Sequence, residues 1–281
     1  MREEPYKILY PILFAQRYLF SVLMRILGLN RRTYVREHEL GEWISPSREP
    51  KRQVVFYIHG GGFCFGGGKS NRALGEKLAF YTQREVYTFD YALSPEYPFP
   101  IALNDCLSAY QHLQHLVKAD QRFDSIVFVG DSAGGNLALS LLMLLSERKF
   151  DLPIAVVCLS PWLDLSKNEH SSKHRDPILT STILKIGRTF YTANRNDLKN
   201  PLISPFFGSF PKQVPILIHA GTHEILLEEI LEFENRMKKE GCNIEIKVWP
   251  NQSHVFQIKE RFIKAARDSL QDIRTFIDRV S

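Results

Sequence analysis

The sequence predicts an α/β fold in which a mostly parallel central sheet is flanked by helices. Six short apolar runs alternate along the chain with longer segments of helical periodicity. This alternation is typical of parallel strands joined by helices that cover both faces of the sheet. The 281 residues, 44% of them hydrophobic and 24% charged, are enough to bury the core that such a sheet needs. We therefore expect a single domain over residues 1–281.

The expected strands are the apolar and β-branched runs at residues 54–58, 86–90, 125–130, 154–160, 215–221 and 244–249. Helical patterns lie between and after them, at residues 71–83, 101–118, 133–148, 225–240 and 257–279. The interval near 166–212 is polar and too long for an ordinary connection. We expect it to carry a helix near 178–192 and to form a helical cap together with residues 1–40, over the carboxyl edge of the sheet.

Residues 8–28 are apolar enough to suggest a membrane segment, but Arg17 and Arg25 interrupt them. A charge in mid-span costs about 2.5–3.5 kcal/mol on insertion scales. Glu3 and Glu4 dilute the positive start of a secretory signal, and no small-residue cleavage site follows. An amphipathic cap helix is therefore expected, with peripheral membrane contact through residues 8–28 as the alternative.

The net charge of +5 is spread over nearly equal numbers of basic and acidic residues, without a block of one sign. This distribution argues against a nucleic-acid partner. Four cysteines lie far apart, and no histidine cluster has the spacing of a metal site: Cys64, Cys106, Cys158 and Cys242. We expect free thiols in a reducing, cytoplasmic compartment, and neither a metal nor a cofactor.

The glycine-rich stretch HGGGFCFGGGKS at residues 59–70 allows two interpretations. Its GKS ending is the tail of a phosphate-binding P-loop, but that motif needs a glycine where Phe63 stands. A dinucleotide fingerprint starting at Gly60 needs a glycine at the position of Phe65. Both nucleotide motifs fail, so the HGGG beginning favours an oxyanion site. We expect the second half to be a flexible exit into the next helix, and three residues to pack beside the site: Phe63, Cys64 and Phe65.

The segment GDSAG at residues 130–134 supplies a nucleophile for that oxyanion site. It follows an apolar strand and opens a helix, which is the context of the GxSxG nucleophile elbow centred on Ser132. Small flanking residues permit the sharp turn, and the helix N-terminus directs backbone N–H groups at the reacting atoms. We assign the oxyanion donors to Gly61, Gly62 and Ala133.

A serine nucleophile needs a histidine base and an acid that orients the histidine. In hydrolases with a GxSxG elbow, the acid and then the histidine follow the serine along the chain. His254 lies in a polar loop between the last strand and the last helix, and we assign it as the base. Glu224 follows the preceding strand and is assigned as the acid. The alternatives are a carboxylate that stabilises a first helical turn, or His223 as the base. Glu228 and Glu229, further along that helix, are expected to face solvent.

These residues resemble the hormone-sensitive-lipase-like branch of the α/β-hydrolase esterases. The landmarks are HGGGF at 59–63, DYALSPEYPFPIALND at 90–105, GDSAGGN at 130–136, SPWLDL at 160–165 and WPNQSHVFQ at 249–257. Many members have Asp-Pro-Leu at the acid position, whereas this chain has Glu224-Ile225-Leu226, like the subset that uses glutamate. The resemblance implies an α/β-hydrolase fold, and supporting roles around the elbow for His59, Gly60 and Asp131.

The function that the resemblance implies is hydrolysis of short- to medium-chain acyl esters through Ser132, His254, Glu224 and a covalent acyl-enzyme. The sequence leaves open a membrane-docked lipase, a lactone hydrolase, a homodimer, and a non-catalytic ligand-binding protein on the same fold, although His254 argues against the last. Four aromatic residues are candidates for an acyl pocket, and core packing explains them equally well: Phe14, Phe20, Phe190 and Tyr191.

Overall fold

A computed structural model describes residues 17–19, 22, 33–38, 41–167, 176–193 and 195–281, with the side chains of 68–71 left out. Its centre is an eight-stranded sheet in the order β1-β2-β4-β3-β5-β6-β7-β8. The strands are β1 Thr33–His38, β2 Gly41–Pro46, β3 Lys51–Ile58, β4 Arg84–Thr88, β5 Ser125–Asp131, β6 Ala155–Leu159, β7 Ile216–Gly221 and β8 Ile244–Trp249. β4, β3, β5, β6, β7 and β8 pair in parallel, whereas β2 is antiparallel to both β1 and β4.

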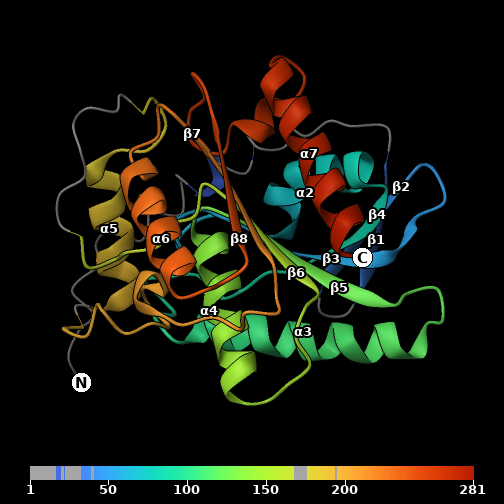
Figure 1. Cartoon of the computed structure of the whole chain (residues 1–281), viewed down its shortest axis with the longest axis horizontal. Coiled ribbons are helices and arrows are strands. Elements are labelled where there is room, and N and C mark those ends of the chain that lie inside the picture. The colour runs from blue at the N-terminus through green and yellow to red at the C-terminus, as the bar shows by residue number, and fades with distance from the viewer. Residues whose placement is uncertain (1–16, 20–21, 23–32, 39–40, 168–175, 194) are drawn as a thin grey trace.

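Helices cover both faces of this sheet (Figure 1). They are α2 Gly68–Thr82, α3 Ile101–Ala119, α4 Ala133–Glu147, α5 Ser181–Thr192, α6 Leu227–Lys239 and α7 Lys264–Val280, with 3-10 turns η2 Pro205–Phe207 and η3 Phe256–Lys259. Side chains of a strand alternate between the two faces. Phe56 of β3 accordingly packs in the core with α3 and α4, whereas Val55 and Tyr57 pack in a second core with α2 and α7. The predicted α/β-hydrolase fold is confirmed.

The N-terminal part of the sheet differs from the expectation. Residues up to about 40 were expected in a helical cap, but 33–38 form β1, the edge strand of the sheet. Its exposed pattern, TYVREH, alternates too weakly to have indicated a strand. Of the first 32 residues only 17–19 and 22 are described, and these are helical. The rest of the 8–28 prediction, with Phe14 and Phe20, lies outside the described residues.

Two helix boundaries also differ. α2 begins at Gly68, so the GKS tripeptide is the first turn of a helix rather than a flexible exit. The last helix begins at Lys264 instead of 257, because the turn η3 and residues 260–263 precede it. The insertion does carry its predicted helix, α5, at 181–192, while residues 168–175 are not described.

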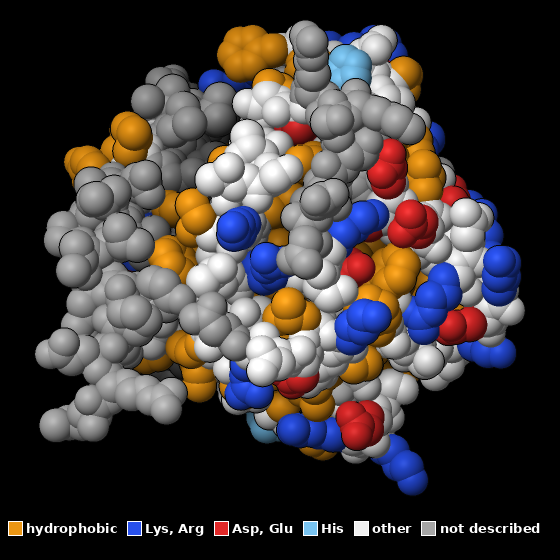
Figure 2. All heavy atoms as spheres, turned by 90° about the vertical axis from the view of Figure 1, so that its left-hand side faces the viewer, with side chains coloured by type: hydrophobic (Ala, Val, Ile, Leu, Met, Phe, Trp, Pro, Cys, Tyr) orange, Lys and Arg blue, Asp and Glu red, His pale blue; other side chains and the backbone are white. Residues whose placement is uncertain are grey.

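The surface and the thiols agree with the composition. On the described part of the face in Figure 2, basic and acidic side chains are interspersed with hydrophobic ones. All four cysteines are free. Burial raises the pKa of the Cys64 thiol to about 12. Within the described ranges, no helix has the length and hydropathy needed to cross a membrane.

Candidate active site

Ser132 occupies a single-residue turn between β5, which ends at Asp131, and α4, which begins at Ala133. Its backbone has φ 53° and ψ −119°, a conformation that costs a non-glycine residue about 1–3 kcal/mol. Two backbone bonds hold it there: Ser132 N–H donates to Leu159 O at 2.8 Å, and Trp162 N–H donates to Ser132 O at 3.2 Å. The turn therefore places the hydroxyl at the carboxyl edge of the sheet.

The glycines on either side of Ser132 are required by close backbone contacts. A Cβ atom on Gly130 would lie 2.3 Å from the carbonyl oxygen of Gly134. A Cβ atom on Gly134 would lie 2.1 Å from the carbonyl oxygen of Ile58 on β3. No side chain fits at these distances, so the small residues of GxSxG let α4 start directly against the sheet.

The three residues predicted as a triad lie together at this edge. His254, in the loop after β8, has Nε2 at 2.9 Å from Ser132 Oγ. Its Nδ1 lies 3.6 Å from Glu224 Oε2, which is an ion-pair distance rather than a hydrogen bond. The side chains of His254 and Glu224 are 7% and 0% exposed. His223, the alternative base, is exposed.

The environment of His254 favours its charged form. Burial acts to lower the pKa of the imidazole, but the adjacent Glu224 carboxylate, with the charges of Asp176 and Asp131, outweighs it, so the pKa lies above its ordinary value. The imidazole of His254 therefore accepts a proton readily, because the surrounding carboxylates stabilise the imidazolium that results.

Ser160 is a site residue that the sequence analysis missed. Its Oγ donates to Glu224 Oε1 at 2.7 Å and accepts the N–H of Val255, next to His254, at 3.1 Å. Gly221 N–H also donates to Glu224 Oε1, at 2.6 Å. The Ser160 hydroxyl thus links the loop after β7, which carries Glu224, to the loop after β8, which carries His254. The available signal was its place at the end of β6, as the first residue of SPWLDL.

Residues 59–65, here called the glycine loop, follow β3 and lie beside the elbow because Ile58 pairs with Gly130. Gly61 O accepts the N–H groups of Cys64 and Phe65 at 3.1 and 2.9 Å, which closes a tight turn. Gly61 and Gly62 have φ of 116° and 60°. A Cβ atom on Gly62 would meet no atom of the described residues within 4 Å.

Asp131 joins the glycine loop to the elbow. Its Oδ1 accepts the Tyr57 hydroxyl at 2.6 Å and the Gly60 N–H at 2.9 Å. Burial raises the pKa of the Asp131 carboxyl, against the effect of these two bonds. His59 is buried and stacked on Tyr91, with ring centroids 4.1 Å apart. Burial lowers the pKa of His59 and so favours the neutral ring. Because a carbonyl oxygen can only accept, Nδ1 carries the proton and donates it to Gly60 O at 2.8 Å.

Helix α5 closes one side of this site. A Cβ atom on Gly187 would lie 3.1 Å from Gly62 O and 3.4 Å from the Trp162 ring, so the missing side chain lets the helix approach the glycine loop. The Tyr191 ring stacks on Phe63 at 3.7 Å between centroids. Cys64 packs against Phe190 in a small apolar cluster that also includes Phe65. The three loop residues expected to pack beside the site therefore contact α5 or its neighbours.

The expectation that Glu229 faces solvent was wrong. Its side chain is 1% exposed, and Oε1 accepts the Leu163 N–H at 2.8 Å. Burial raises the pKa of this carboxyl to about 8. Helical periodicity alone could not reveal this, because the partner N–H belongs to a loop after β6. Glu228 is half-buried.

Glu229→Gln is expected to stabilise the protein increasingly as pH rises. The folded-state pKa lies above the ordinary value of 4.5, so the contribution of Glu229 to stability is full below pH 4.5 and is lost toward pH 8. Glutamine stays neutral and keeps an acceptor for Leu163. Urea unfolding should show its advantage growing by roughly 2–3 kcal/mol between about pH 5.5 and about pH 8.

Two further variants bracket that result. Glu229→Ala leaves the Leu163 N–H without this acceptor and should lose about 1–3 kcal/mol. Glu232→Gln changes a side chain that is 61% exposed on the same helix and should show no such pH dependence. A Glu229→Gln protein with the wild-type pH dependence of stability would contradict the prediction.

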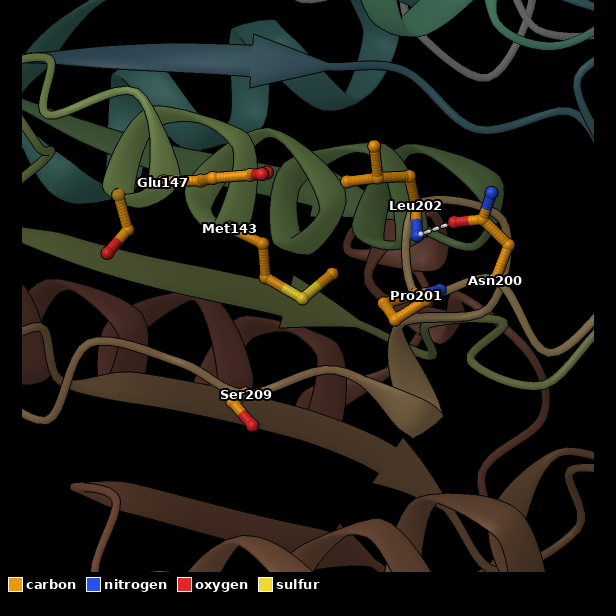
Figure 3. A pocket seen from close by; sticks show the side chains of 7 residues that line it. Met143, Glu147, Asn200, Pro201, Leu202 and Ser209 are labelled. Atoms are coloured by element: carbon orange, nitrogen blue, oxygen red, sulfur yellow. Dashed lines mark hydrogen bonds between the residues drawn. The ribbon is translucent and has the colours of Figure 1, made fainter.

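A separate surface hollow lies at the far end of α4 (Figure 3). It has a volume of about 450 Å³ and is lined by Met143, Ser146, Glu147, Asn200, Pro201, Leu202 and Ser209. Since α4 runs 15 residues away from Ser132 at about 1.5 Å per residue, the hollow is remote from the triad.

Among the described residues, no group of three His, Cys, Asp or Glu side chains has the arrangement of a metal site.

Comparison with known proteins agrees with the observed fold. A family model described as alpha/beta hydrolase fold matches residues 55–258. An esterase of Acinetobacter venetianus is 31% identical over 93% of this chain and 88% of its own length. An acetyl-hydrolase of Streptomyces hygroscopicus is 30% identical over 85% of this chain and 80% of its own.

Solved structures give the same picture. A hormone-sensitive lipase from a metagenome library superposes with a TM-score of 0.88 at 29% identity, over 96% of this chain and 93% of the other. A homologue of hormone-sensitive lipase, also from a metagenome library, has a TM-score of 0.86 at 28% identity over the full length of both chains. The chain therefore belongs to the alpha/beta hydrolase fold family, within its hormone-sensitive-lipase branch of esterases, as its motifs predicted.

Proposed function

We propose that this protein is a serine carboxylesterase that hydrolyses short- to medium-chain acyl esters through Ser132, His254 and Glu224. The observation that carries the proposal is the contact of 2.9 Å between Ser132 Oγ and His254 Nε2, with Glu224 Oε2 at 3.6 Å from the other ring nitrogen. A hydroxyl bonded to an imidazole that faces a carboxylate is the arrangement that activates a serine for acyl transfer.

In the proposed reaction, Ser132 Oγ attacks the ester carbonyl carbon while His254 Nε2 takes its proton. The tetrahedral oxyanion is stabilised by backbone N–H groups of Gly61, Gly62 and Ala133, the last at a helix start where N–H groups have no intrahelical partner. The imidazolium then protonates the departing alcohol, and the acyl-enzyme remains. A water deprotonated by His254 attacks the acyl carbon, and the proton returns to Ser132 as the acid leaves.

The acyl-chain range is supported by the closeness of α5. Gly187 brings this helix against Gly62 O, and Trp162, Phe63 and Tyr191 form an aromatic cluster on the same side. Such a wall favours compact acyl groups over long chains, and the relative named acetyl-hydrolase supports the short end of the range.

A p-nitrophenyl ester series from acetate through butyrate and octanoate to palmitate tests the proposal. We expect kcat/KM to be highest among the short and medium chains and to fall steeply at palmitate. Diethyl p-nitrophenyl phosphate should abolish the activity and add its phosphoryl group to the peptide that contains Ser132, as detected by mass spectrometry.

Each other outcome identifies a different function. Highest turnover on palmitate, and only with lipid vesicles present, would indicate a membrane-docked lipase. Faster hydrolysis of a δ-lactone than of any linear ester would indicate a lactone hydrolase. No turnover together with no phosphorylation would indicate a ligand-binding protein and would refute an esterase.

A further inference from the structure

The guanidinium of Arg17, from the N-terminal segment, bonds to the glycine loop. Its Nε donates to the carbonyl oxygen of Cys64 at 2.7 Å, and Nη2 donates to that of Ser94 at 2.8 Å. Both terminal nitrogens also donate to the Glu96 carboxylate, at 2.8 and 2.9 Å. The Arg17 side chain is 15% exposed and that of Glu96 is 22% exposed. One side chain thus joins three segments that are distant in sequence.

The part of the glycine loop that Arg17 contacts is strained. Phe63 has φ 63°, in the left-handed region that a bulky side chain disfavours. Such a conformation persists only where its surroundings over-determine it. Phe63 O accepts the Ser94 N–H at 2.9 Å, and its ring stacks on Tyr191. The next carbonyl, of Cys64, accepts the bond from Arg17, so the carbonyls of Phe63 and Cys64 are both linked to the segment around Ser94.

The same turn sets the direction of the glycines that precede it. Cys64 N–H and Phe65 N–H both donate to Gly61 O. The peptide units of Gly61 and Gly62 are therefore linked to Cys64 through one short bonded ring. A rotation of the Cys64 peptide after loss of its external donor would turn the N–H groups that we assign to the oxyanion.

Only an arginine can make this set of contacts. Its planar fork of five N–H donors reaches a carboxylate with two parallel bonds and a carbonyl at its Nε side at the same time. A lysine would supply one ammonium group. Burial acts to raise the pKa of Glu96, but the bonds from Arg17 outweigh it, so its pKa lies below the ordinary value and the pair is ionic at neutral pH.

We propose that Arg17 is a positioning residue for the oxyanion hole: it holds residues 61–65 in the conformation that presents the N–H groups of Gly61 and Gly62 to the reacting carbonyl. The inference rests on the proposed esterase function. Because the oxyanion develops only in the transition state, loss of this alignment lowers kcat and leaves KM nearly unchanged. Arg17 is then part of the unit that supports catalysis, although it lies far from Ser132 in the sequence.

Kinetics of Arg17→Ala and Arg17→Lys with p-nitrophenyl butyrate test this role. The concentration of active sites is taken from the number of sites that diethyl p-nitrophenyl phosphate phosphorylates when that reaction is complete, and rates are expressed per site. We expect Arg17→Ala to lower kcat by about 10- to 100-fold with KM changed by less than about threefold. Arg17→Lys should be intermediate. Methylguanidinium should restore part of the kcat of Arg17→Ala in a saturable manner, whereas methylammonium should not.

Arg52→Ala is the matched control. Arg52 also donates to both oxygens of a carboxylate, Asp124, and to a backbone carbonyl, Gln121 O, but it is exposed and lies near the opposite end of β3. Its kcat should equal that of the wild type. If Arg17→Ala fails to fold, Glu96→Gln carries the test, because it keeps the side-chain volume, removes the charge and should lower kcat selectively but less.

The proposal is overturned if the kcat of Arg17→Ala per titrated site equals that of Arg52→Ala. It is also overturned if the loss of kcat in Arg17→Ala is proportional to the unfolded fraction of the protein and methylguanidinium restores no activity. Either result would leave a wild-type enzyme that hydrolyses esters through Ser132, so the esterase function would stand. A wild-type protein without ester turnover would instead remove the function on which the inference rests.

Discussion

Ser132→Ala is expected to lower kcat for p-nitrophenyl butyrate by about 10⁴- to 10⁶-fold, the range typical for loss of a serine nucleophile. The methyl group of alanine cannot attack the carbonyl, while the glycine loop and the helix start still surround it. Residual hydrolysis should come only from the oxyanion donors and from substrate binding. Stability should change little, because alanine meets the same backbone strain at φ 53°.

Ser140→Ala is the control for that variant. Ser140 lies on the same helix, is fully buried, and has its hydroxyl 3.4 Å from Asn136 Oδ1, away from the site. Activity should stay at the wild-type level, and only Ser132→Ala should escape labelling by diethyl p-nitrophenyl phosphate. Equal activity of the two variants would show that another residue is the nucleophile.

The parts of the molecule that the sequence predicts best are those in which local pattern and topology agree. GxSxG needs a strand before it and a helix after it, and its glycines make contacts within a few residues or with the neighbouring strand. Glu224 and His254 each follow a parallel strand, and the carboxyl ends of parallel strands share one edge. These facts bring three distant residues together without any knowledge of packing.

The features that escaped prediction depend on contacts between distant segments. Ser160 is an unremarkable serine until its hydroxyl is seen between Glu224 Oε1 and the Val255 N–H. Glu229 is an acid in a helix where acids usually face water, and its burial follows from the backbone of Leu163. Arg17 reads as a charge that interrupts an apolar segment, yet its partner is Glu96. Side-chain partners across loops leave no periodic trace in a sequence.

The acid assignment leads to the second large expected effect, in Glu224→Gln. An amide can still accept hydrogen bonds from Ser160 and Gly221, so the local fold should persist. It carries no charge to stabilise the imidazolium of His254, and we expect kcat to fall by about 10²- to 10⁴-fold. Glu234→Gln, which removes an ion pair with Lys238 on α6, should retain full activity.

The pH dependence separates a catalytic Glu224 from a merely structural one. The base must be neutral, so kcat/KM rises with pH through the pKa of His254 in the free enzyme. Because Glu224, Asp176 and Asp131 hold that pKa above its ordinary value of 6.5, the acidic limb of the wild-type profile should lie above pH 6.5. Without the Glu224 charge, the effect of burial is less opposed, and the pKa of His254 falls. The limb should therefore move to lower pH in Glu224→Gln and stay in place in Glu234→Gln. A Glu224→Gln enzyme that loses rate with an unmoved limb would mean that the carboxylate only supports the loop after β7, and the orienting charge would have to be sought in Asp176.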